Sequence, residues 1–180
     1  MFKKLLNKFK LCRKRTERPE KKVENKKLPF EKIDVRAGKI TFDQRIQLGK
    51  IFQEQGREFD MFCKVFQCLH GYTPKVHETK NLLPYYYDII EGVTHWLQAE
   101  NTMLQNEPSS EEVSAGIKEL SEKIGEFGTI KSLAKNYSKD PDDILAWEYG
   151  KVFGILYTDL EEYNYQKRYN KVVERKYRNK

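Results

Sequence analysis

Three cysteines and three histidines are the side chains of this sequence best suited to metal binding or nucleophilic catalysis. Four of them fall close together in the pattern C-x4-C-x-H-x6-H, at Cys63, Cys68, His70 and His77. Zinc sites usually have tighter ligand pairs separated by a longer loop. Cys63 and Cys68 also fall on different faces of an expected helix. An odd number of cysteines argues against a disulfide framework and favours a reducing compartment. We therefore expect no metal and no cofactor.

Motifs that would mark an enzyme do not occur in the sequence. Glycine-rich phosphate loops, H-E-x-x-H and G-x-S-x-G are all missing. His95 adjoins Trp96 on an apolar helix, which favours a surface or interface histidine over a general base. The acidic pairs 111–112 and 142–143 fall at expected helix N-termini, where the helix dipole accounts for them. The pair 161–162 belongs to an expected solvated helix face. We therefore predict that the chain has no catalytic residues and is not an enzyme.

The charge is concentrated at the two ends of the chain. The formal net charge is +7, from 34 basic and 27 acidic residues. Residues 1–27 carry 12 Lys or Arg and 3 Glu, a net of +9, and residues 167–180 carry 7 basic residues and Glu174, a net of +6. The remainder, residues 28–166, therefore has a net charge of −8. Basic ends attract polyanions, although charged tails that keep the protein soluble are an equal alternative.

Residues 1–15 predict a basic amphipathic helix. Its expected partner-binding or polyanion-binding residues are Lys3, Lys4, Lys8, Lys10, Arg13, Lys14 and Arg15. Such a helix suits a protein partner, nucleic-acid phosphate or a membrane surface. Lysines interrupt the apolar stretch that a signal peptide needs, and no run is long enough for a membrane span. Residues 16–32 are charged, contain two prolines and predict a flexible linker.

The body is predicted to be all-α, a compact bundle of five or six helices over residues 33–166. Residues 1–32 are the arm and linker in this division, and residues 167–180 a basic helical extension. Thr41 and Gln44 form a capping box that starts a helix ending near Gly56.

The remaining helices are predicted from apolar spacing and from start signals. A helix at about 57–70 is apolar on most sides and is expected at the centre of the core. The next is expected to have Pro84 in its first turn. A capping box at Ser109 precedes a two-heptad seam that predicts a bundle helix, formed by Val113, Ile117, Leu120, Ile124 and Phe127. Asp140 and Pro141 start the last helix, which is expected to be long and to run on towards Tyr177.

A row of small residues on this last helix predicts an interface. The row consists of Ala146, Gly150 and Gly154, beside Tyr157. Each glycine costs up to ~1 kcal/mol inside a helix, so close packing of another helix, from this chain or a partner chain, would explain the row. Isolated glycines are also tolerated in soluble helices, so chance is the alternative. Basic and aromatic residues that suit interfaces or stacking on bases follow at Arg168, Tyr169, Arg175 and Tyr177.

Residues 40–55 (ITFDQRIQLGKIFQEQ) and 140–171 (DPDDILAWEYGKVFGILYTDLEEYNYQKRYNK) resemble small helical accessory proteins of tailed bacteriophages. The similarity is to tail-assembly chaperones and virion-assembly proteins of phages that infect Bacteroides-like gut bacteria, and no site residue carries over from it. It implies a non-enzymatic interaction protein, either a virion structural component or an assembly factor of tail or capsid. Its partners would be other phage subunits or further copies of the chain, in the cytoplasm of a bacterial host or in the virion. The alternatives are a nucleic-acid-binding protein that uses its basic ends and a peripheral membrane protein anchored by its arm.

Overall fold

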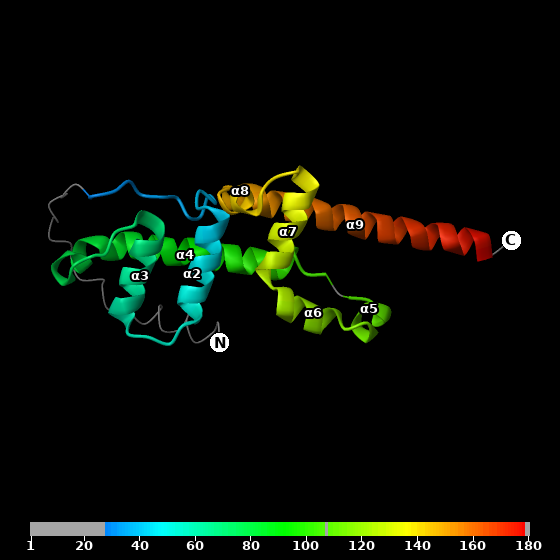
Figure 1. The fold of residues 1–180 in the computed structure, drawn as a ribbon, viewed down its shortest axis with the longest axis horizontal. Helices are drawn as coiled ribbons and strands as arrows, with labels where there is room; N and C mark the ends of the chain where they lie inside the picture. The colour runs from blue at the N-terminus through cyan, green and yellow to red at the C-terminus, as the bar shows by residue number, and fades with distance from the viewer. Residues whose placement is uncertain (1–27, 107, 179–180) are drawn as a thin grey trace. The chain divides into compact units, whose positions relative to one another are not determined.

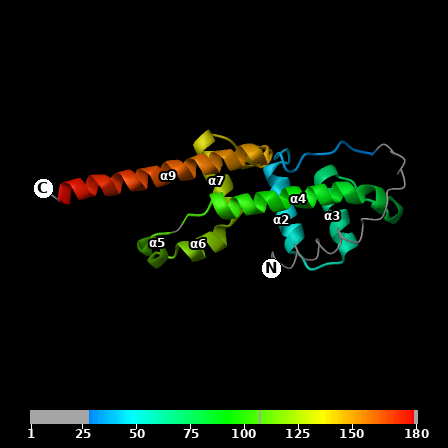
Figure 2. The same ribbon diagram turned by 180° about the vertical axis from the view of Figure 1, so that it is seen from behind.

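The computed structural model describes residues 28–106 and 108–178, so the basic arm of residues 1–27 lies outside the described part. The chain divides into two units, residues 1–31 and 32–180, and the helices of the described part belong to the second (Figure 1, and from behind in Figure 2). In the described part they are α2 (Phe42–Gln53), α3 (Glu58–His70), the 3-10 turn η1 (Val76–Glu78), α4 (Thr79–Met103), α5 (Ser110–Ser114), α6 (Ile117–Ile124), α7 (Glu126–Tyr137), α8 (Pro141–Leu145) and α9 (Tyr149–Arg178). The described residues form no strand, which confirms the all-α prediction.

The start of α2 is the capping box that the sequence predicts. The Thr41 hydroxyl accepts a hydrogen bond from the Gln44 N–H, and the Gln44 side chain accepts one from the Thr41 N–H. The same Gln44 amide donates to the carbonyls of Cys68 and Leu69, at 3.4 Å each. One side chain therefore caps α2 and also ties it to the end of α3. The helix ends at Gln53, a little before the predicted stop at Gly56.

α3 contributes one buried side to the core, formed by Phe62, Val65, Phe66 and Leu69, while its other side is exposed, so the predicted place at the centre of the core is not confirmed. Val65 and Phe66 have no exposed surface. The ring of Phe62 packs at 4.8 Å from that of Phe66 and at 5.0 Å from that of Tyr86 on α4. Gly71 ends the helix with φ 62°, in the left-handed region that glycine adopts without strain.

The prediction that Pro84 occupies a first turn is wrong, because α4 begins more than one turn earlier. A proline inside a helix deprives the carbonyl four residues before it, here that of Lys80, of its hydrogen bond. Pro84 and Lys80 are both exposed, so water can satisfy this carbonyl. The opposite side of α4 is buried, and the burial of Leu82, Tyr85 and Ile89 holds the helix together across the proline.

The seam predicted over residues 113–127 is not one helix. α5, α6 and α7 take its place, separated at Gly116 (φ 83°) and Gly125 (φ 51°). Residues in this left-handed region cannot continue a right-handed helix. Within the described part, α6 packs chiefly against its chain neighbours, and much of the seam is exposed: Val113 by 45%, Leu120 by 51%, Ile124 by 40% and Phe127 by 61%.

The last predicted helix is two helices. Asp140 caps α8 as predicted, accepting a hydrogen bond of 3.1 Å from the Asp142 N–H, and Pro141 occupies the first turn. The chain leaves the helix after Leu145 and re-enters one at Tyr149. α9 has 30 residues and is therefore ~45 Å long. These breaks explain why the described part has more helices than the five or six predicted for the body.

Candidate helix-docking interface

A strap of residues 33–41 anchors the start of α9 to α4. On one side, a Cβ added to Gly92 of α4 would lie 2.9 Å from the Cβ of Val35 in the strap. On the other side, a Cβ on Gly38 would lie 2.7 Å from the Cα of Gly150 in α9. The strap is therefore held between two helices at distances that leave no room for a side chain at Gly38 or Gly92.

Backbone hydrogen bonds join the strap to the start of α9. The Tyr149 N–H donates to the Ile40 carbonyl at 2.7 Å, and the Gly150 N–H donates to the Gly38 carbonyl at 3.1 Å. The first N–H groups of a helix have no partner within it. Here the strap supplies that partner, which explains why the chain breaks between α8 and α9 rather than continuing as one helix.

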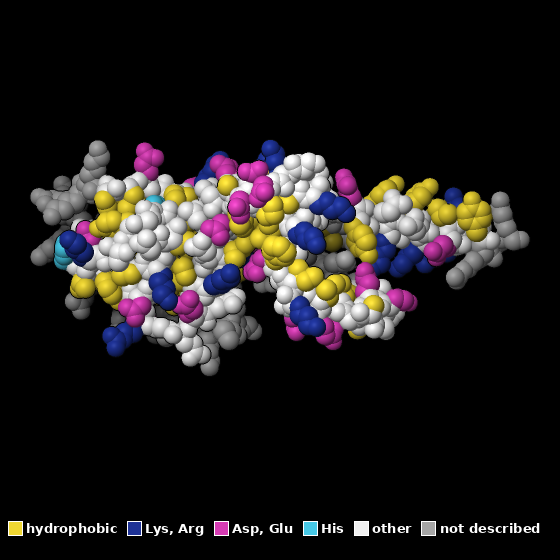
Figure 3. All heavy atoms as spheres, viewed as in Figure 1, with side chains coloured by type: hydrophobic (Ala, Val, Ile, Leu, Met, Phe, Trp, Pro, Cys, Tyr) yellow, Lys and Arg dark blue, Asp and Glu magenta, His cyan; other side chains and the backbone are white. Residues whose placement is uncertain are grey.

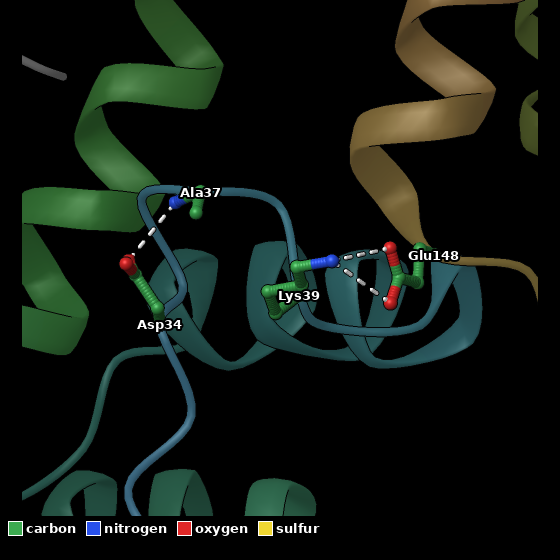
Figure 4. A network of polar contacts seen from close by, with 4 residues as sticks. All are labelled: Asp34, Ala37, Lys39 and Glu148. Atoms are coloured by element: carbon green, nitrogen blue, oxygen red, sulfur yellow. Dashed lines mark hydrogen bonds and ion pairs between the residues drawn. The ribbon is translucent and has the colours of Figure 1, made fainter.

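Two polar contacts of the strap are visible in Figure 4. The Asp34 carboxylate accepts a hydrogen bond of 2.9 Å from the Ala37 N–H, which closes a tight turn. The Lys39 ammonium lies 3.1 and 3.3 Å from the two carboxylate oxygens of Glu148. Both charged side chains are 58% exposed, so this ion pair contributes little beside the backbone bonds.

A half-buried polar cluster locks α2, α4 and α9 together beside the strap. The Arg45 guanidinium pairs with the Glu100 carboxylate, with Nε at 2.7 Å from Oε1, and the Tyr149 hydroxyl donates to the same oxygen. The Tyr149 ring packs edge-on against Trp96 and stacks on Phe42. Burial, reinforced by the hydrogen bond to Glu100, raises the pKa of Tyr149 far above its usual range. The cluster therefore joins three helices through the shared carboxylate of Glu100.

Beyond Phe153, α9 has no buried side chain in the described part. At about 100° per residue, one set of residues lies on the side opposite the buried Tyr149 and Val152. We call this set the outer face of α9: Gly154, Thr158, Glu161, Tyr165, Arg168, Tyr169 and Val172. All of them are exposed, Tyr165 by 60%, Tyr169 by 52% and Val172 by 51%. Figure 3 shows hydrophobic side chains along the edge of α9 that lies away from α5 and α6.

The charges of α9 are segregated along its length. Acidic residues precede Tyr165, at Asp159, Glu161 and Glu162, and basic residues follow it, at Lys167, Arg168, Lys171, Arg175 and Lys176. The exceptions are Glu174 in the second half and Lys151 near the start of the helix, whose ammonium lies 4.0 Å from the centre of the Trp147 ring. Within the described residues no ion pair joins the two groups. On the outer face Glu161 lies before Tyr165 and Arg168 after it, and neither forms an ion pair within the part of the chain that the structure describes.

The predicted row of small residues is not a row on one helix. Ala146 follows α8 as its C-cap, and so it is not part of α9. Gly150 packs on the strap, not on a helix: a Cβ there would lie 3.4 Å from the Ala37 carbonyl. Gly154 has nothing within 4 Å of its added Cβ, and Tyr157 is 37% exposed at the edge of the outer face. Packing of a partner chain at these last two residues stays a prediction.

The predicted basic and aromatic residues are divided between two sides of α9. Arg168 and Tyr169 belong to the outer face and Arg175 lies at its edge, whereas Tyr177, 75% exposed, falls on another side. The predicted binding residues of the arm, from Lys3 to Arg15, lie outside the described residues.

Within the described residues, Cys63, Cys68 and the three histidines are not brought together into a ligand set. The Cys63 thiol lies 3.7 Å from the Pro74 carbonyl, and His70 Nε2 lies 3.0 Å from the Tyr85 hydroxyl. Burial raises the pKa of Cys68 to about 11. Over the described ranges, no group of three or more His, Cys, Asp or Glu could hold a metal ion.

A shallow cleft of about 370 Å³ lies beside the strap. It is lined by residues 32–36 together with Tyr85, Asp88 and Glu91, and Arg36 pairs with Glu91 at 3.2 Å. The cleft therefore contains both acidic and basic side chains, two of which pair with each other, and its charge does not select one class of ligand. Among the described helices, none has both the length and the apolar character needed to cross a bilayer.

The strap and the polar cluster are features that sequence reasoning missed. Arg45 lies 55 residues from Glu100, and no short motif connects them. The one local signal was an arginine placed between the apolar positions Phe42 and Ile46. No known protein family matches the chain, and no curated protein or solved structure is detectably similar to it.

Proposed function

We propose that this chain is a non-enzymatic protein–protein interaction protein and that the outer face of α9 is its docking surface. The observation that supports this proposal is a helix with no buried side chain beyond Phe153 in the described part, whose outer face carries the exposed Tyr165, Tyr169 and Val172 with Tyr157 at its edge. Tyr163 and Tyr177 are exposed on other sides of the same helix. Scattered exposed apolar residues are ordinary, but aromatic residues aligned on one side of a helix are typical of interfaces.

The anchoring of α9 fits this role. Helices in proteins gain most of their stability from packing an amphipathic face, and the second half of α9 has no fully buried side chain in the described part. The strap and the Arg45–Glu100–Tyr149 cluster fix the start of the helix. A helix that is held at one end and has one exposed face is pre-organised to receive a partner on that face.

An assembly role in a phage tail or capsid is the setting that we propose for this interaction. It is carried by the resemblance of residues 40–55 and 140–171 to phage accessory proteins.

Nucleic-acid binding is the second candidate, since Arg168, Lys171 and Arg175 follow one another along α9 beside Tyr169. Phosphate contacts combined with ring stacking would bind a single or double strand. Glu161 on the same face would repel phosphate, which favours the protein partner.

Photo-cross-linking of the full chain tests the proposed function. A benzophenone amino acid replaces Tyr165 on the outer face in one variant and the exposed Gln166, on a different side, in the control. We expect discrete protein adducts at position 165, with the chain itself or with a bacterial lysate, and few at position 166. Equal labelling at both positions would overturn the proposal. Salt-sensitive duplex binding that Arg168→Glu abolishes, without protein adducts, would replace it by the nucleic-acid function.

A further inference from the structure

We infer that the outer face of α9 docks on the same face of a second copy of this chain, as an antiparallel helix pair with a two-fold axis near Tyr165. This inference rests on the proposed function and names the partner. Three features of the described residues support it: the order of charges along α9, the sizes of the side chains that would meet, and the side of the helix on which the face lies.

The order of charges is self-complementary for antiparallel helices. When the two-fold axis passes near Tyr165, a residue that precedes Tyr165 in one copy lies level with the residue that follows Tyr165 by the same number of positions in the other copy. Glu161 then lies within about one residue, ~1.5 Å along the axis, of the second copy's Arg168. The two-fold axis repeats this pair, so both carboxylates and both guanidiniums find partners.

A parallel pair would have the opposite effect. Each residue would then face its own counterpart, so Glu161 would oppose Glu161 and Arg168 would oppose Arg168. Like charges directly opposed are destabilising. The charge pattern therefore selects the antiparallel arrangement.

Side-chain sizes also match in the antiparallel register. Thr158 is level with Val172 of the second copy, because each is seven residues from Tyr165, and both side chains are compact enough to meet across a close helix pair. Gly154, whose added Cβ would meet nothing within 4 Å, gives the end of the second helix room for close approach. The two Tyr165 rings, each 60% exposed in the single chain, would meet at the axis.

The position of the face leaves room for two whole chains. It lies opposite the side of α9 that carries the buried Tyr149, Val152 and Phe153, through which α9 packs on the rest of its unit. In the pair, each unit therefore lies on the far side of its own helix. The same patch is used by both copies, so the association closes as a dimer and does not propagate into a filament.

Sedimentation equilibrium of the full chain tests the inference. One helix pair is a small interface, so we expect reversible dimers at about 1 to 100 µM. Arg168→Glu and Glu161→Arg should each weaken dimerisation by about tenfold or more, because each creates two like-charge pairs. The double variant, in which the charges are exchanged, should restore it. The two residues are seven apart on one helix and do not touch within a chain, so rescue reports an intermolecular contact.

A matched control variant distinguishes the loss of this intermolecular contact from the effect of the changed net charge. Lys167→Glu makes the same change of net charge as Arg168→Glu but lies off the outer face, so it should leave the dimer nearly unchanged. Circular dichroism confirms that each variant is folded. A chain that stays monomeric, or a dimer insensitive to both single variants, would overturn the inference. If the monomeric chain still gives adducts with another protein at position 165, the inference fails and the proposed function stands.

Discussion

Replacing Gly38 by alanine should destabilise the protein much more than the same replacement at Gly71. Both glycines have positive φ, +72° at Gly38 and +62° at Gly71, and a non-glycine residue in this region costs ~1–2 kcal/mol. At Gly71 nothing lies within 4 Å of the added Cβ, so this conformational cost is the whole effect. At Gly38 the added Cβ would lie 2.7 Å from Gly150 backbone atoms and 2.9 Å from the Trp96 ring.

The strap cannot move away from this contact without losing backbone hydrogen bonds. The Gly150 N–H donates to the Gly38 carbonyl at 3.1 Å, and the Tyr149 N–H to the Ile40 carbonyl at 2.7 Å. Overpacking of this kind costs a further ~1–3 kcal/mol. We therefore expect a loss of ~2–5 kcal/mol for Gly38→Ala and ~1–2 kcal/mol for Gly71→Ala. Urea unfolding followed by circular dichroism gives both losses of free energy of unfolding. Equal losses for the two variants, within error, would refute the close packing of Gly38 between Gly150 and Trp96.

Three further perturbations probe the core and the surface. Glu100→Ala removes the carboxylate that pairs with the Arg45 guanidinium, which is only 12% exposed. The free energy of unfolding should therefore fall by ~3 kcal/mol. A loss below ~1 kcal/mol in a urea titration would contradict the stabilising role of the cluster. Gly154→Ala should stabilise the monomer by up to ~1 kcal/mol, because alanine has the higher helix propensity. Gly92→Ala should instead lower the melting temperature, because its Cβ would lie 2.9 Å from strap atoms. A Gly92→Ala variant that melts at a higher temperature than Gly154→Ala would contradict the close packing of the strap on α4. Because burial raises the pKa of Cys68 to about 11, its alkylation, located by peptide mass spectrometry, should be slow at about pH 8 and rise about tenfold per pH unit up to that pKa. Labelling at pH 8 as fast as that of an exposed thiol would show that the side chain is not buried.

Three helix starts, those of α2, α5 and α8, were predictable from the sequence because their signals are local. The capping boxes at Thr41 and Ser109 and the cap at Asp140 each depend on a partner two or three residues away. The helix breaks were not predictable in the same way. Lys39 and Glu148 meet across 109 residues, and the break between α8 and α9 exists because the strap binds there.

In the candidate site, too, the features that depend on local spacing were predictable and those that depend on distant contacts were not. The exposed side that includes Gly154, Arg168 and Tyr169 follows from helical periodicity, since nothing else in the described chain covers it. Gly150 was grouped with that side from its spacing, yet it packs on a strap that periodicity does not reveal. The heptad pattern over residues 113–127 wrongly predicts one helix, because the spacing of apolar residues does not reveal that Gly116 and Gly125 adopt positive φ and end the helices there.

Disulfide trapping between copies tests the antiparallel docking of α9 most directly. In a chain whose three native cysteines are replaced by serine, Thr158→Cys and Val172→Cys are made separately, and both positions are exposed. In the antiparallel pair, position 158 is level with position 172 of the other copy, while two copies of position 158 lie ~21 Å apart along the axis. Mixing the two variants under mild oxidation should therefore give a mixed disulfide dimer that neither variant forms alone, because a disulfide requires Cα atoms within about 7 Å. Homodimers from each variant alone, or no trapped dimer from the mixture, would contradict this account.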